Sequence, residues 1–246
     1  MSVDKITSMK EGGQKLAVIK QFIGKYAQTE RSIAKIDAKV ESLIRSSGAK
    51  PSFQMVPGYR WSTCINVNDS IVHGIPQNGF LSPGDLVTID LGLYWQGYHL
   101  DSAVSLIVGS STKAVKQFLS VGQAVLQNTI TQATVGHTVR DLSHTMQVGI
   151  EKAGYNVVRQ LTGHGVGREL HEYPPIPCYV SKGPEMKVRL SPGMTIAIEV
   201  MYTMGDWQLT TDPDGWTMRT KDGTLSAVVE ESVLITAAKP IVLTAL

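Results

Sequence analysis

The stretch LVTIDLGLYWQGYHLDSAVSLIVG, residues 86–109, has the alternating apolar pattern of a β-hairpin. Asp90 and Asp101 interrupt its apolar runs, where an unpaired carboxylate is costly. With the turn centred between Trp95 and Gln96, Asp90 lies opposite Asp101. Because facing carboxylates repel, we predict a cation between them, or one carboxyl protonated at a raised pKa. The alternative is another register, in which one aspartate is an ordinary turn or rim residue.

Helical periodicity occurs on both sides of this hairpin. Apolar residues recur at threes and fours over 6–43, which predicts one or two amphipathic helices. The same spacing over 113–131 predicts a further helix. Thr138 and Asp141 resemble a capping box, which would open a helix that ends before Gly154.

Strand patterns make up much of the remaining sequence. CINVNDSIVHGIP, residues 64–76, reads as two strand pieces broken by its Asn-Asp pair, and strands are also predicted near 156–159, 194–202 and 225–236. Strands and helices therefore interleave. We predict an α+β fold with a mostly antiparallel sheet, and not a parallel doubly wound fold.

Length and composition are those of one folded domain. With 246 residues, 42% hydrophobic and 18% charged, we predict a single domain over 1–246, with a helical segment at 1–50 and a core at 51–246. The start lacks a signal-peptide pattern and no run approaches the ~18 apolar residues of a membrane span, so we expect a cytoplasmic protein without a membrane partner. Cys64 and Cys178 fit neither a disulfide framework nor a zinc motif, so both are expected to be reduced.

The charges are nearly balanced. The formal net charge is +2, which does not indicate a nucleic-acid partner. Lysines recur every five residues from Lys5 to Lys25, a step of about 140° on a helix, so we expect them to be scattered over a solvated surface. We also expect His99, the basic residue nearest to the two aspartates, to be exposed.

Two glutamates interrupt other strand-like runs. Glu199 lies in TIAIEVMY and Glu230 in AVVEESVL, and each taken singly could be an edge or solvent-facing residue. Glu230 and Glu231 are adjacent, so in a strand they point to opposite faces. Only one of them can line a shared interior site.

The stretch LTGHGVGRELHEYP, residues 161–174, carries two histidines. The spacing of seven between His164 and His171 does not fit a helical HExxH zinc motif. In a strand these positions face opposite ways, so the chain must bend, and we predict that Gly165 and Gly167 allow this through backbone angles that other residues avoid. Taken alone, His164 could be a hydrogen-bonded core histidine.

Together these residues provide a ligand set. Carboxylates can bridge two ions, so four misplaced acids with one glycine-framed histidine predict a two-metal site. Such a set suits Mn(II), Fe(II) or Co(II) at least as well as Zn(II). The candidate ligands are Asp90, Asp101, His164, Glu199 and Glu230.

The chain resembles the type I methionine aminopeptidases of the pita-bread hydrolase fold, from its helical start to about residue 236. The order and spacing of the matching motifs are highly specific. The resemblance implies a curved, mostly antiparallel sheet flanked by helices in two pseudo-symmetric halves. The motifs are CINVND-x-x-VHGIP, TIDLGL with LDSA, LTGHGVGRELHEYP, MTIAIEV and DGWTMRTKDGTLSA with the glutamate after it.

The resemblance implies a role for each ligand. Asp90 would chelate one metal ion, His164 and Glu199 the other, and Asp101 with Glu230 would bridge the two. A water activated by both cations would be the nucleophile, and Glu199 would transfer its proton.

Four further sets of positions follow from the resemblance. His73 matches the histidine that contacts the substrate amide nitrogens, and His171 the one that stabilises the carbonyl oxygen as the tetrahedral intermediate forms. Both would be catalytic and substrate-binding. The wall of a methionine pocket matches Tyr59, Cys64, Leu170 and Trp216, although Cys64 and Leu170 could equally be ordinary core residues. The chain departs from the common pattern at Leu100, Leu170, Val200 and Glu231, which stand where glycine, an aromatic, proline and histidine are frequent.

The implied activity is removal of the initiator methionine from newly synthesised proteins when the second residue is small, by a metallo-exopeptidase that uses two divalent ions (Co, Mn, Fe or Zn). The partners would be the N-terminal peptides of such proteins; we expect a monomer, and ribosome association is left open. The alternatives are an Xaa-Pro-cleaving enzyme of the same fold, which usually carries a preceding domain, and a noncatalytic peptide-binding relative. Retention of all five ligands argues against the latter.

Overall fold

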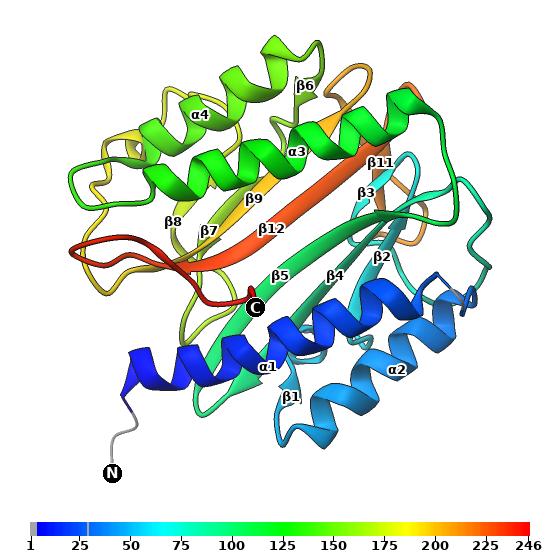
Figure 1. Cartoon of the computed structure of the whole chain (residues 1–246), viewed down its shortest axis with the longest axis horizontal. Helices are drawn as coiled ribbons and strands as arrows, with labels where there is room; N and C mark the ends of the chain where they lie inside the picture. The colour runs from blue at the N-terminus through cyan, green and yellow to red at the C-terminus, as the bar shows by residue number, and fades with distance from the viewer. Residues whose placement is uncertain (1–3, 29) are drawn as a thin grey trace.

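Four α-helices form at the predicted places in the computed structural model, which describes residues 4–28 and 30–246 (Figure 1). Asp4 caps the first helix by accepting a hydrogen bond from the Thr7 amide at 3.1 Å. The predicted capping box is present, because the Asp141 side chain accepts from the Thr138 amide at 2.7 Å and the Thr138 side chain accepts from the Asp141 amide. None of the helices in the described chain is long and apolar enough to cross a membrane. The helices are α1 (Lys5–Tyr26), α2 (Ile33–Ser46), α3 (Lys113–Gln132) and α4 (Val139–Lys152).

The strands pair in antiparallel fashion throughout the described part of the chain, as predicted. They form three hydrogen-bonded sheets and not one continuous sheet. One sheet contains β1, β2, β4 and β5, a second β3, β10 and β11, and the third β6–β9, β12 and β13. The strands are β1 (Lys50–Pro51), β2 (Thr63–Val67), β3 (Ser70–Val72), β4 (Leu86–Trp95), β5 (Tyr98–Ile107), β6 (Asn156–Val157), β7 (Thr162–Gly165), β8 (Glu172–Pro177), β9 (Thr195–Thr203), β10 (Leu209–Thr211), β11 (Met218–Thr220), β12 (Ser226–Leu234) and β13 (Ile241–Val242).

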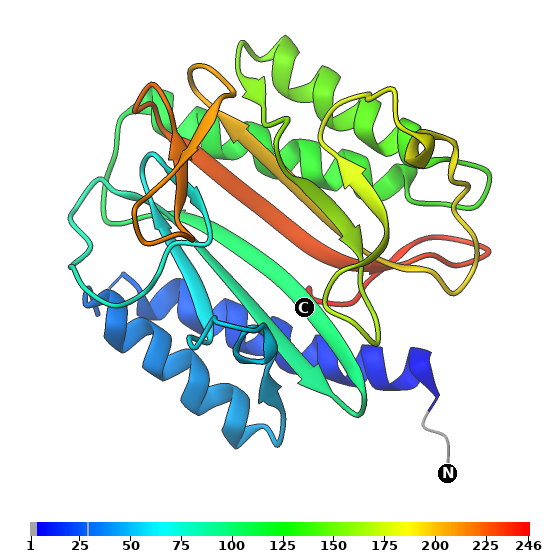
Figure 2. The same ribbon diagram turned by 180° about the vertical axis from the view of Figure 1, so that it is seen from behind.

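The elements divide into two halves, each with two helices over a sheet. Helices α1 and α2 cover the half that contains β4 and β5, and α3 and α4 cover the half that contains β9 and β12 (Figure 1). All four helices lie on the same side of the sheets, which are in front of the helices in the reverse view (Figure 2). The long strands β5 and β12 run side by side in the middle, where the halves meet (Figures 1 and 2). The arrangement confirms the predicted α+β fold.

The central hairpin has a different register from the predicted one. Its turn is Gln96–Gly97, with φ of 49° and 94°, so Trp95 pairs with Tyr98. Positive φ at both turn residues is the geometry that matches strand twist in a two-residue hairpin, and glycine favours it. Asp101 therefore lies opposite Gly92, two residues from Asp90. An offset of two keeps both carboxylates on the same face, as diagonal neighbours.

Two expectations about basic residues are wrong. Lys20 is not solvated, because its side chain is 13% exposed and forms an ion pair with Glu231 at 2.5 Å. Lys15 donates to the Ser47 carbonyl oxygen at 2.8 Å. His99 is 6% exposed, and its Nδ1 is 2.6 Å from the Ser52 hydroxyl. The division into a 1–50 segment and a 51–246 core stays a prediction.

Candidate metal centre and substrate pocket

The five candidate ligands come from five different strands, which lie on both sides of the boundary between the two halves. Asp90 and Asp101 lie on β4 and β5, and the other three on β7, β9 and β12. Glu199 and Glu230 are direct partners in the β9–β12 ladder. The alternating faces of each strand and the shared curvature of the sheets bring residues far apart in sequence to one point.

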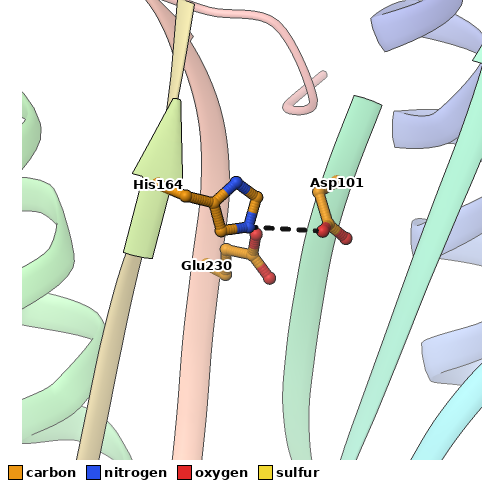
Figure 3. A group of neighbouring side chains, drawn as sticks. All are labelled: Asp101, His164 and Glu230. Atoms are coloured by element: carbon orange, nitrogen blue, oxygen red, sulfur yellow. Dashed lines mark ion pairs between the residues drawn. The ribbon is translucent and has the colours of Figure 1, made fainter. Parts of the chain in front are cut away.

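The His164 ring presents one nitrogen to the carboxylates of the cluster. Its Nδ1–H donates to the Gly165 carbonyl oxygen at 2.8 Å, which leaves Nε2 without a proton in the neutral ring. Nε2 lies 3.4 Å from Glu199 Oε1 and 3.8 Å from Asp101 Oδ2. Figure 3 shows the ring pointing between the carboxylates of Asp101 and Glu230, and the ligand atoms of these three residues all lie within 4.8 Å of one another.

The carboxylates lack the protein partners that buried acids ordinarily have. Asp90 Oδ1, Asp101 Oδ1 and Glu230 Oε1 are buried without a hydrogen-bond partner in the described chain. Such atoms are costly unless a further group satisfies them. Divalent cations would do so, because hard oxygen ligands with one imidazole suit them, and the residues therefore fit two metal ions.

The electrostatics point in the same direction. Desolvation, followed by repulsion from Asp101 and Glu199, raises the pKa of Asp90 well above its ordinary value. Desolvation also raises the pKa of Asp101, Glu199 and Glu230. By contrast, desolvation lowers the pKa of His164 to about 4, so its ring is neutral at pH 7. A cluster of this kind holds its carboxylates ionised only when cations compensate them.

Every residue predicted for the site lines one cavity of about 200 Å³. His73 and His171 lie in its wall with the ligands, and the His164 and His171 rings meet edge to face with centroids 4.4 Å apart. Partial desolvation lowers the pKa of both His73 and His171, so both are neutral hydrogen-bonding groups at pH 7. His73 has a positive φ of 58°, a strained backbone conformation for a residue other than glycine. Strain of this kind is concentrated at active sites and ligand-binding sites.

The four predicted pocket residues gather at one end of the cavity. Tyr59, Cys64 and Leu170 are buried together, with Trp216 packed against them. The Tyr59 and Trp216 rings meet edge to face at 5.1 Å. Cys64 pairs with Asp90 across the β2–β4 ladder, so the apolar pocket begins directly beside the carboxylates.

Sequence reasoning missed part of the wall. Phe53 and Val56 line the same cavity, and Phe53 is packed against the pocket residues. Their signal was weak: Phe53 is in the short 3-10 helix Phe53–Met55, where no periodic pattern forms. Leu161, Thr162 and Met201 also line the cavity.

The glycines around His164 have a different purpose from the predicted one. Gly163, Gly165 and Gly167 do not have positive φ. A Cβ on Gly163 would be 2.6 Å from the Ala197 carbonyl oxygen, and one on Gly165 would be 2.6 Å from that of Tyr173. Gly163 and Gly165 are needed because β9 and β8 approach β7 too closely for a side chain, not because of their backbone angles. A Cβ on Gly167 would instead be 2.7 Å from Glu172 Oε1.

This cavity, with buried acids and one imidazole beside an apolar pocket and two neutral histidines, defines a metal-dependent hydrolase of the α+β class. The sequence pattern of metallopeptidase family M24 matches residues 7–237. The chain belongs to this family, which uses divalent metal ions, and it has the pita-bread fold.

Named relatives agree with this assignment. The chain is 38% identical to methionine aminopeptidase 1 of Bacillus subtilis over 230 residues, which cover 93% of this chain and 91% of the relative. It superposes on the crystal structure of a methionine aminopeptidase from Thermotoga maritima with a TM-score of 0.94 and 37% identity, covering 98% and 97% of the two chains. A prolidase from Pyrococcus horikoshii gives 0.77 and 25% identity, and the match covers 61% of that chain. The predicted family resemblance is confirmed.

Proposed function

We propose that this chain removes the N-terminal methionine from polypeptides whose second residue is small, as a metal-dependent methionyl aminopeptidase. The observation that carries the proposal is the single cavity in which a cluster of buried carboxylates directly adjoins an apolar pocket. The unbranched thioether of methionine suits a pocket of Tyr59, Cys64, Leu170 and Trp216. The extent of the match to relatives named methionine aminopeptidase supports it further.

In this proposal Asp90, Asp101, His164, Glu199 and Glu230 would hold the metal ions. When bound, the ions supply Lewis-acid polarisation and lower the pKa of an attacking water molecule. The chain's own residues do the rest. Glu199 moves the water proton toward the leaving amine, while the neutral His171 ring donates to the substrate carbonyl oxygen as negative charge develops there. His73 contacts the amide nitrogens of the substrate and holds the scissile bond in place.

A peptide panel tests this function. Purified chain with Mn(II), Fe(II) or Co(II) should release methionine from peptides that begin Met-Gly or Met-Ala and leave Met-Leu peptides intact. Asp101→Asn should abolish release, whereas Glu41→Gln, which alters only a surface ion pair with Arg45, should not change it. Cleavage of Xaa-Pro peptides without cleavage of Met-Ala peptides would assign the proline-directed activity instead. Peptide binding without any cleavage would assign the noncatalytic alternative.

The setting of the reaction is also part of the proposal. Substrates that are N termini of newly made proteins place the enzyme in the cytoplasm, and one cavity built within one chain can work as a monomer. Sedimentation velocity of the purified chain tests the monomer. Ribosome association, which the sequence leaves open, is tested by co-sedimentation with ribosomes.

A further inference from the structure

The two strands that carry the central carboxylates are not joined by a backbone ladder. β5, with Asp101, belongs to one sheet, and β12, with Glu230, belongs to another. Serine hydroxyls join them instead. The Ser102 hydroxyl donates to the Glu230 carbonyl oxygen at 2.8 Å, and the Ser232 hydroxyl donates to that of Asp101 at 2.8 Å. We call this contact between β5 and β12 the seam.

The seam determines how far apart the two carboxylates lie. Asp101 and Glu230 project from it on the cavity side, while their neighbours Ser102 and Glu231 point to the opposite side, toward α1. A change in the spacing of the strands therefore changes the spacing of the carboxylates directly. Hydroxyl bridges are a less rigid connection than a ladder, because a hydroxyl can rotate to another acceptor.

Lys20 of α1 contacts one of these bridges. Its ammonium lies 2.5 Å from Glu231 Oε1 and donates to Ser102 Oγ at 2.8 Å. An ammonium has no acceptor, so Ser102 must accept from it, and the single Ser102 proton is left for an oxygen of β12. Glu231 is held in turn by Thr244, which donates to Oε2 at 2.5 Å.

We propose that the Lys20–Glu231 ion pair is a positioning device for the metal centre: by orienting Ser102 across the seam, it sets the separation of Asp101 and Glu230. This inference rests on the proposed function, because it takes those carboxylates as the bridging ligands. Lys20 and Glu231 contact neither substrate nor metal and act only through the strands that they join. The ion pair is nearly buried, with side chains 13% and 12% exposed, so its geometry is held firmly.

Stability and positioning can be separated by variants. Lys20→Met leaves the Glu231 carboxylate without its cation, which is destabilising for a nearly buried group. The double variant Lys20→Met/Glu231→Gln removes both charges and should regain most of that stability. It still lacks the ammonium that orients Ser102. Ser102→Ala removes the bridge itself with little change in volume. Lys15→Met is the matched control, because it also removes a lysine of α1, but one whose hydrogen bond, to the Ser47 carbonyl oxygen, lies away from the seam.

The test is calorimetric titration of the metal-free proteins with Mn(II), beside urea unfolding of each. We expect the wild type and Lys15→Met to bind two ions. In the double variant and in Ser102→Ala, one binding step should weaken by about 10-fold to 100-fold, the range for groups that orient metal ligands. Wild-type affinities for both ions in these two variants would overturn this inference and leave the function intact. A wild-type chain that binds no Mn(II) would overturn the metal assignment, and this inference with it.

Discussion

Gly163→Ala tests how closely β7 must approach β9 to bring His164 to the metal centre. The added methyl group would be 2.6 Å from the Ala197 carbonyl oxygen. Neither atom can rotate away, because the oxygen is part of the backbone and the methyl carbon is bonded directly to it. Ordinary contact begins near 3.4 Å, so the strands must separate by roughly 0.8 Å. We expect the free energy of unfolding to fall by about 1–3 kcal/mol, the usual cost of overpacking. Because His164 follows in the chain, its Nε2, now 3.4 Å from Glu199 Oε1, should move as well and weaken Mn(II) binding.

Urea unfolding of the metal-free proteins measures the first effect and calorimetric Mn(II) titration the second. Gly24→Ala is the matched control: it lies in α1, and nothing is within 4 Å of the added methyl group. That substitution should stabilise the chain by up to about 1 kcal/mol through helix propensity. If Gly163→Ala is as stable as Gly24→Ala and binds Mn(II) like the wild type, the close approach of the strands is not what these glycines provide.

Three other predictions follow from the site. His171→Ala should keep its bound metal but lower turnover about 100-fold to 1000-fold, measured by metal analysis and steady-state kinetics; loss of metal would make it a ligand instead. In the metal-free chain, the raised pKa values of Asp90, Glu230 and Asp101, the last to about 7, mean that the folded state binds more protons than the unfolded state, so the free energy of unfolding should fall as pH rises through about 7. The lowered histidine pKa values act oppositely only below about pH 6.5. Mn(II) should remove most of this dependence in urea unfolding, and a metal-free chain that gains stability over this range would contradict it. Burial raises the pKa of the Cys178 thiol to about 12 and that of Cys64 well above its ordinary value, so an aromatic disulfide reagent at pH about 8 should react with neither until the chain is unfolded. Rapid reaction of the native chain would contradict their burial.

Local signals predicted most of the fold. The capping box of α4 and the apolar spacing of α3 gave helices within a residue or two of those observed, because caps and periodicity act within a few residues. The predicted hairpin register differs from the observed one by two residues, because the prediction placed the turn at Gln96–Gly97 one residue too early. Both aspartates nevertheless remained on one face, since strand faces alternate with a period of two.

The site residues could be predicted where an ionisable side chain interrupts an apolar strand pattern. An acid within an apolar strand is unexpected unless a partner compensates it, and this drew attention to Asp90, Asp101, Glu199 and Glu230. The supporting residues carried no such signal. Lys20 on a helix and Ser102 on a strand are ordinary in sequence, and only the packing of α1 against the seam brings them to Glu231. The assignment of the four acids to metal binding, and of Glu199 to proton transfer, stays a prediction.

Crystals soaked in Mn(II) and measured at the manganese absorption edge test the central claim most directly. We predict two anomalous peaks within the cavity, one beside Asp90 and the other beside His164 Nε2 and Glu199, with Asp101 and Glu230 between them. Ligand oxygens should lie about 2.0–2.3 Å from the peaks, typical of divalent transition metals. No peak among these residues in fully soaked crystals, or ions held by other side chains, would contradict the account.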